Sequence, residues 1–346
     1  LAYLGFDESL VTEDPKWPWL RWIEAEHPEH YAWALAMVWH WPNHPRPKQG
    51  PQADRARQEL LIPLRSKSAW EMMYPSPLPP EVHDTTFITE LGLDFMDRHQ
   101  AQNGDQPFFC HVSYVDPHDP YDPPEPYASM YDPEDMSDAL PAEWDGQGFE
   151  TLRSSQRFFR NFEAIKDRPE ILRQWRALYH GSLRYMDDQI ARLVDHLQAN
   201  GLWENTILVF TTDHGEMLGD HGLFSKGVKH YDKGIRCPLI VAGGPVAGRP
   251  DDRPSDRLTC TLDFYPTFCD WANVAQQDRP PLEGKSFAGL CAGLESDEVW
   301  REVSVAIGTA ESVITDDGWR LTRYLADDKG QMFNLVEDPD EQHNLY

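Results

Sequence analysis

An unbroken run of apolar and β-branched residues, Ile207 to Thr212, ends directly in Asp213 and His214. Such a run predicts a strand that is buried on both faces of a mainly parallel sheet. In open α/β sheets, ligands gather beyond the carboxyl ends of the strands. We therefore expect Asp213 and His214 to face a site rather than the core.

Three glycines, Gly215, Gly219 and Gly222, follow this pair and loosen the backbone into a loop that returns Lys226 toward the strand end. A divalent cation accepts oxygen and nitrogen ligands of the kind that an aspartate and a histidine offer. A lysine close by can hold an anionic substrate against the metal. An Asp-His pair at a strand end can also serve only as a cap for the following helix, and the pair by itself does not exclude this alternative.

The formal charge of −27, from 58 acidic and 31 basic residues, argues against nucleic acid or an anionic membrane as the main partner. An anionic ligand must then be captured by local positive charge. No apolar run approaches the roughly 18 residues of a membrane-spanning helix, so we expect no span. The five cysteines follow neither metal nor disulfide spacing, and we expect them to behave as buried, small apolar residues.

The middle of the chain alternates helical and extended patterns. Apolar residues at core spacing predict helices over residues 84–99 and 170–200. Residues 107–115 predict a strand, which ends in a loop where prolines fix His118 just past the strand end. The second helix leads directly into the strand at Ile207, so we expect an α/β fold with a right-handed crossover.

The two ends of the chain follow other patterns. Residues 17–80 are rich in Trp, Pro and His with poor periodicity, which predicts packed loops with short helices. The histidines of this region fit no standard zinc spacing: His27, His30, His40 and His44. Short alternating runs after residue 298 predict a small antiparallel sheet.

Several phrases together resemble the type I sulfatases, which belong to the alkaline phosphatase superfamily with the phosphonate monoester hydrolases. They are Asp-His-Gly-Glu from Asp213, Ser-Lys-Gly around Lys226, Pro-His-x-Pro-Tyr around His118, and the carboxyl-terminal segment from Met332. The resemblance implies an alkaline phosphatase-like α/β fold, in which helices sandwich a mainly parallel sheet. It assigns residues 1–295 to a catalytic domain that lacks its amino-terminal part, and residues 296–346 to a small, incomplete α+β subdomain.

The resemblance also implies an activity, the hydrolysis of sulfate esters. It makes Asp213 and His214 metal ligands, and His118 and Lys226 catalytic and substrate-binding residues. His118 either protonates the leaving oxygen or binds the ester, and the sequence does not separate these roles. The implied cation is calcium, although the nitrogen ligand at His214, where many relatives carry Asn, leaves manganese or zinc open. The expected partner is a sulfated small molecule or glycan.

The family's nucleophile is a formylglycine made from Cys or Ser in the pattern Cys/Ser-x-Pro/Ala-x-Arg, which occurs nowhere in the chain. We therefore expect an inactive fragment of a protein that is longer at both ends. One alternative is a phosphonate monoester or phosphodiester hydrolase of the same superfamily. Another is a degenerate, non-catalytic relative that keeps the fold as a binding module. Cellular location and oligomeric state stay open.

Overall fold

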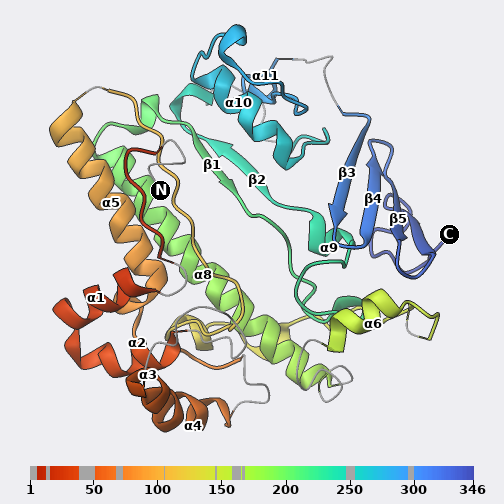
Figure 1. Ribbon diagram of the computed structural model, residues 1–346, viewed down its shortest axis with the longest axis horizontal. Helices are drawn as coiled ribbons and strands as arrows, with labels where there is room; N and C mark the ends of the chain where they lie inside the picture. The colour runs from red at the N-terminus through yellow and green to blue at the C-terminus, as the bar shows by residue number, and fades with distance from the viewer. Residues whose placement is uncertain are drawn as a thin grey trace. The chain divides into compact units, whose positions relative to one another are not determined.

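The computed structural model describes residues 6–12, 16–38, 51–67, 73–104, 106–144, 146–157, 165, 168–246, 254–294 and 300–346. Contacts within the chain define two compact units. Unit 1 comprises residues 1–138 and 168–199, and unit 2 comprises residues 139–167 and 200–346. Figure 1 labels the helices and most of the strands of both. The expected domain boundary after residue 295 falls outside the described residues and stays a prediction.

Two long helices, α5 (Asp84–Asn103) and α8 (Pro169–Ala199), form the frame of unit 1. They lie side by side (Figure 1), and the hydroxyl oxygens of Thr86 and Tyr185 are 2.6 Å apart between them. The apolar stripe expected of the second helix is buried: Ile171, Trp175, Leu178, Met186, Leu193 and Leu197. Both predicted helices are confirmed, because periodic apolar residues bury one face of each.

The amino-terminal region of unit 1 consists of short helices, as expected. They are α1 (Trp17–Glu26), α2 (Tyr31–Met37), α3 (Pro51–Ala56), a π-helical turn (Arg57–Leu61) and α4 (Ile62–Arg65). Trp19, Leu20 and Ile23 of α1 share a buried core with Leu35 of α2 and Phe87 of α5. Unit 1 also has 3-10 turns at Pro28–His30, Pro80–Val82, Tyr127–Ser129 and Pro133–Asp135.

The segment 107–115, expected to be a strand, joins no strand ladder in the part of the chain that the structure describes. Exposed and half-buried side chains still alternate along it. The predicted strand is therefore not formed among the described residues, because an alternating pattern alone makes no strand without a hydrogen-bonded neighbour. The parallel contact nearby is a single bridge, between Met73 and Tyr121.

The strand before the Asp-His pair is β1 (Leu208–Thr211), which pairs antiparallel with β2 (Leu239–Ala242). The expected strand exists, but its described partner is antiparallel, and its side chains are half-buried or exposed rather than buried on both faces. The physical reason is that β2 covers one edge of β1, and no further described strand completes a sheet around it.

The carboxyl-terminal sheet of unit 2 is an antiparallel meander in the order β3-β4-β5-β6. Its strands are β3 (Glu302–Ile307), β4 (Ala310–Thr315), β5 (Trp319–Tyr324) and β6 (Lys329–Asn334). This confirms the predicted small antiparallel sheet, because alternating short runs encode strands with one buried face.

The α-helices described in unit 2 are α6 (Glu150–Arg157), α9 (Asp232–Ile235), α10 (Phe264–Trp271) and α11 (Ala288–Cys291). Its 3-10 turns are Trp203–Asn205, Asp220–Gly222, Gly244–Val246, Thr261–Asp263 and Gln276–Asp278. All five cysteines are free thiols, but only Cys269 is buried, so the expectation that they are buried apolar residues is wrong for the other four. No described helix is both long and apolar enough to cross a bilayer.

Candidate functional site

Asp213 and His214 follow the end of β1 after a single residue, Thr212, close to where the sequence predicts them. The His214 Nε2 atom lies 3.6 Å from Asp213 Oδ1, and the Asp213 side chain is 84% exposed. His214 Nδ1 lies 2.9 Å from the carbonyl oxygen of Gly215. Because a carbonyl can only accept, Nδ1 is the donor of this bond, and a neutral ring would present its lone pair at Nε2, beside the carboxylate.

This pair fits part of a metal centre. Two donors that each lie about 2.2 Å from one ion are separated by roughly 3–4 Å, which matches the spacing of Nε2 and Oδ1. A metal-binding histidine characteristically donates its other ring N–H to a backbone carbonyl, as His214 does. Among the described residues, however, no group of three or more Asp, Glu, His or Cys side chains could hold an ion. Asp213 and His214 by themselves offer one carboxylate and one imidazole nitrogen as donors.

The loop that follows the pair is closed at its base. The Gly215 N–H donates to the Gly234 carbonyl at 2.9 Å. A Cβ atom at Gly215 would lie 1.9 Å from the Lys233 carbonyl oxygen, so only glycine permits this closure. Inside the loop, Glu216 accepts hydrogen bonds from the backbone N–H groups of Leu218 (3.2 Å) and Ser225 (2.5 Å). These bonds hold the stretch before Lys226 in one conformation.

Lys226 lies on this closed loop and is half-buried. A second lysine, Lys229, is 2% exposed and donates from Nζ to the Lys226 carbonyl oxygen at 2.9 Å. Burial lowers the pKa of Lys229 to about 8, while the nearby Glu216 carboxylate opposes that shift and the Lys226 ammonium adds to it. Two ammonium groups and one carboxylate thus lie close together on the loop that begins at the Asp-His pair.

Glu216 and Lys229 were not predicted from the sequence to have a role. The available signals were an acidic residue two positions after His214 and a second lysine three positions after Lys226. Neither spacing shows by itself that the two side chains support the same backbone segment. That information comes from the hydrogen bonds of the folded loop.

His118 belongs to unit 1, whereas Asp213, His214 and Lys226 belong to unit 2. The His118 backbone N–H donates to the Val115 carbonyl at 2.9 Å. Its Nδ1 lies 2.7 Å from the Asp119 carbonyl oxygen and 3.1 Å from Asp119 Oδ1. The proton of the neutral ring is therefore on Nδ1, so Nε2 can accept a proton and can donate it once the ring is protonated.

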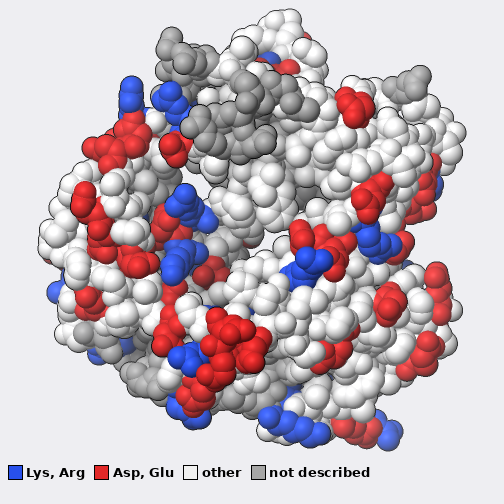
Figure 2. Space-filling view, turned by 180° about the vertical axis from the view of Figure 1, so that it is seen from behind, with Lys and Arg blue, Asp and Glu red and all other residues white. Residues whose placement is uncertain are grey.

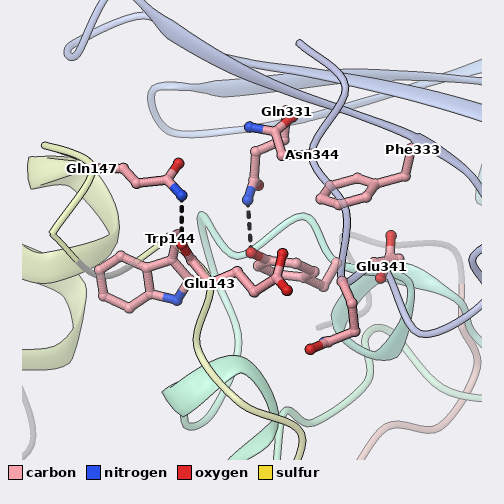
Figure 3. Close-up of a pocket in the computed structure, with 9 residues that line it drawn as sticks. Glu143, Trp144, Gln147, Gln331, Phe333, Glu341 and Asn344 are labelled. Carbon is pink, nitrogen blue, oxygen red and sulfur yellow. Dashed lines mark hydrogen bonds between the residues drawn. The ribbon is translucent and has the colours of Figure 1, made fainter.

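A small hollow in unit 2 is lined by three aromatic side chains, Trp144, Tyr231 and Phe333, together with polar ones (Figure 3). Its polar groups bond within the protein: Gln331 Nε2 donates to the Tyr231 hydroxyl at 2.6 Å, and Gln147 Nε2 donates to the Glu143 carbonyl at 2.6 Å. We therefore interpret this hollow as packing around the carboxyl-terminal sheet.

Comparisons with known proteins define the class of protein. The family model described as "Sulfatase" matches residues 35–274, and that described as "N-sulphoglucosamine sulphohydrolase, C-terminal" matches residues 219–346. The chain therefore belongs to the sulfatase family, the type I sulfatases of the alkaline phosphatase superfamily, as the sequence motifs indicated.

Among its relatives, the chain is similar to "Arylsulfatase" of Clostridium perfringens, with 30% identity over 76% of this chain and 54% of that protein. It is 30% identical to "Choline-sulfatase" of Rhizobium meliloti, over 76% of this chain and 51% of that protein. The "Multifunctional alkaline phosphatase superfamily protein PehA" of Trinickia caryophylli is 33% identical over 66% of this chain and 45% of that protein. The chain thus spans about half the length of these relatives.

Two solved structures show the same fold. The phosphonate monoester hydrolase of Agrobacterium radiobacter matches with a TM-score of 0.69 and 21% identity, over 96% of this chain and 65% of that chain. The enzyme SpPMH of Silicibacter pomeroyi matches with a TM-score of 0.70 and 22% identity, over 94% of this chain and 65% of that chain. These matches confirm the alkaline phosphatase-like α/β fold class.

Proposed function

We propose that this chain forms part of a sulfuric ester hydrolase, in which Asp213 and His214 bind a divalent metal and Lys226 and His118 act on the sulfate ester. The observation that carries the proposal is the orientation of the His214 ring. Its Nδ1 is fixed by the Gly215 carbonyl, and its Nε2 lies 3.6 Å from Asp213 Oδ1. Membership of the sulfatase family supports the same reaction.

The roles follow from the chemistry of each group. A bound divalent cation would polarise the sulfuryl group and stabilise the negative charge that develops on its oxygens. The Lys226 ammonium, on a loop held by Glu216 and Lys229, would bind a sulfuryl oxygen. His118, in its protonated form, would donate from Nε2 to the leaving oxygen, or bind the ester before cleavage. The nucleophile, by family a formylglycine, would come from outside these residues.

We propose calcium as the ion, by resemblance to the family. The nitrogen ligand at His214 also suits manganese or zinc, because imidazole is a better ligand for these ions than for calcium. Metal content of the purified protein, measured by mass spectrometry after expression in metal-supplemented medium, distinguishes the three. The variant His214→Ala should bind the ion on the order of 100-fold more weakly, whereas the exposed-site control His343→Ala should not.

A second candidate is hydrolysis of phosphonate monoesters or phosphodiesters. It is favoured by the nitrogen ligand and by similarity to a relative named as a multifunctional member of the superfamily. The decisive assay compares kcat/KM for an aryl sulfate and the matching aryl phosphonate monoester, using the protein translated from the complete reading frame. We expect the sulfate to be preferred. A large preference for the phosphonate would overturn the sulfatase proposal.

A non-catalytic binding relative is the third candidate. The complete reading frame tests it directly, since a catalytic protein should encode Cys/Ser-x-Pro/Ala-x-Arg and the first metal aspartates. Absence of that motif from the whole frame, together with binding of sulfated ligands without turnover, would favour the binding role.

A further inference from the structure

The loop that carries His118 is bounded by two buried carboxylates, Asp116 and Asp122. Asp116 accepts a hydrogen bond from the Thr85 hydroxyl at 2.5 Å. Its Oδ2 lies 4.0 Å from Nδ1 of His83, and that nitrogen lies 3.0 Å from Asp84 Oδ1. His83, Asp84 and Thr85 lie at the start of helix α5. The amino terminus of α5 therefore binds Asp116, at the first end of the loop.

Lys16, just before α1, forms an ion pair with the same Asp84. Lys16, His83, Asp84, Asp116 and Asp122 together form a buried charge cluster, which contains two basic and three acidic side chains. The side chains of Lys16, His83, Asp84 and Asp116 are between 5% and 21% exposed. Beyond the loop, the Ser76 N–H donates to the Pro123 carbonyl at 3.0 Å, which fixes the second end.

The charges of the cluster depend on one another. Burial alone would lower the pKa of His83, but Asp84, Asp116 and Asp122 raise it to about 9. Burial would raise the pKa of Asp84, but Lys16 and His83 hold it far below its usual range. Burial raises the pKa of Asp116, and it raises that of Asp122 to about 6, with His83 opposing both shifts. At neutral pH the two cations therefore face Asp84 and the two loop-end carboxyls.

We propose that this buried charge cluster positions His118, by holding the first end of the loop 116–122 against the amino terminus of α5 while the Ser76–Pro123 hydrogen bond holds the second end. The need for such a device follows from the fold. Among the described residues, the segment 107–115 before the loop joins no strand ladder, so no described sheet hydrogen bond contributes to the position of His118. The cluster supplies that order through charged groups on sequence-distant elements. The positioning role deepens the proposed function and rests on it, whereas the loop anchoring can be tested without activity.

Amide hydrogen exchange tests the anchoring. The variant Asp84→Asn removes the carboxylate shared by Lys16 and His83, and Thr85→Val removes only the hydroxyl that Asp116 accepts from. In each, the amides of His118 and Ser76 should exchange about 10-fold faster or more, since charge-assisted bonds are lost. The control Asp94→Asn removes an exposed carboxylate of α5 that pairs with Arg98, and should leave these amides unchanged. Unchanged exchange in both cluster variants would overturn the anchoring.

Two substitutions of Lys16, one that removes its charge and one that keeps it, distinguish an effect of charge from an effect of side-chain packing. Lys16→Met should give the same faster exchange as Asp84→Asn, whereas Lys16→Arg should restore most of the protection because it keeps the cation opposite Asp84. If Lys16→Arg and Lys16→Met behave alike, the cluster holds the loop by packing and the charge-based proposal is wrong. These measurements remain interpretable if Asp84→Asn folds poorly.

Kinetics tests whether the anchoring acts through His118. In the protein from the complete reading frame, Asp84→Asn should lower kcat/KM for an aryl sulfate about 10- to 100-fold at temperatures where it is folded. In a His118→Ala background the same substitution should cost little, because there is no imidazole left to position. Additive losses would show a general structural effect and overturn the positioning role. Normal anchoring in a protein without sulfatase activity would instead contradict the proposed function alone.

Discussion

At the scale of single residues, the loop after β1 combines a ligand pair with two supporting side chains. Glu216 accepts backbone hydrogen bonds before Lys226, and Lys229 donates to the Lys226 carbonyl oxygen. Lys226, which is proposed to act on the ester, is thus held in place by two residues to which the sequence motifs assign no role. The buried ammonium of Lys229 is unusual, because lysines are rarely buried without compensation.

Lys226→Ala should lower kcat/KM for a sulfate ester on the order of 100-fold or more, since an ammonium beside a developing anion stabilises the transition state strongly. Circular dichroism and the unfolding midpoint should stay unchanged. Lys67→Ala, at an exposed position of unit 1, is the control. Unchanged steady-state kinetics in Lys226→Ala would remove this lysine from the site.

Lys229 predicts a pH effect on stability. Burial lowers its pKa from 10.5 to about 8, so the unfolded chain binds more protons than the folded chain between these pH values. The free energy of unfolding should therefore gain a rising contribution from pH 8 to about 10.5. Lys229→Met should lack that rise and should be more stable at pH 7. Urea unfolding of both proteins across this range measures the difference, and equal pH slopes would contradict the assignment.

At the scale of elements, a buried ion pair joins the tail of the chain to the carboxyl-terminal sheet. Arg320 of β5 lies 2.6 Å from Glu341, and both side chains are at most 2% exposed. The Glu341 carboxylate also accepts from the Asp232 N–H at 2.8 Å, at the start of α9. Burial raises the pKa of Glu341, and Arg320 opposes that rise. The pair thereby ties β5 to the end of the Lys226 loop.

Arg320→Met should destabilise unit 2 by about 3–5 kcal/mol, because it leaves a buried carboxylate without its partner. The matched control is Arg301→Met, which removes an exposed arginine paired with Asp316 and should cost less than about 1 kcal/mol. Denaturant unfolding monitored by tryptophan fluorescence provides both values. A loss below about 1 kcal/mol for Arg320→Met would show that the ion pair contributes little.

At the scale of the whole molecule, the surface is acidic. Figure 2 shows Asp and Glu side chains spread over one face, in keeping with the net charge of −27. An anionic ester must therefore be bound by cations placed locally, as proposed for Lys226. Such binding should be sensitive to the loss of one lysine because the surrounding surface does not compensate for it.

The 346-residue chain by itself should not turn over sulfate esters, because Cys/Ser-x-Pro/Ala-x-Arg occurs nowhere in it. Added calcium, manganese or zinc should not restore activity, since metal supplies no nucleophile of the family type. The measurement uses purified chain of verified intact mass with an aryl sulfate in large excess. Multiple turnovers would show that the nucleophile lies within these residues.

The sequence by itself determined the elements and the local part of the site. The helices α5 and α8 and the meander β3 to β6 follow from apolar periodicity, because hydrogen bonding within a helix or a hairpin is local. Asp213 and His214 are adjacent, and Lys226 lies on the same short loop, so their grouping could be inferred from spacing. Their roles stay predictions.

Only the tertiary structure decided which distant residues meet. The alternating pattern of residues 107–115 does not show whether a neighbouring strand pairs with this segment. In the same way, the sequence of β1 does not show that its described partner, β2, is antiparallel. The ion pairs of Lys16 with Asp84 and of Arg320 with Glu341 join positions far apart in the chain. The stability of such ion pairs depends on how the packed elements exclude water from the charged groups. The spacing of residues along the chain does not predict this packing.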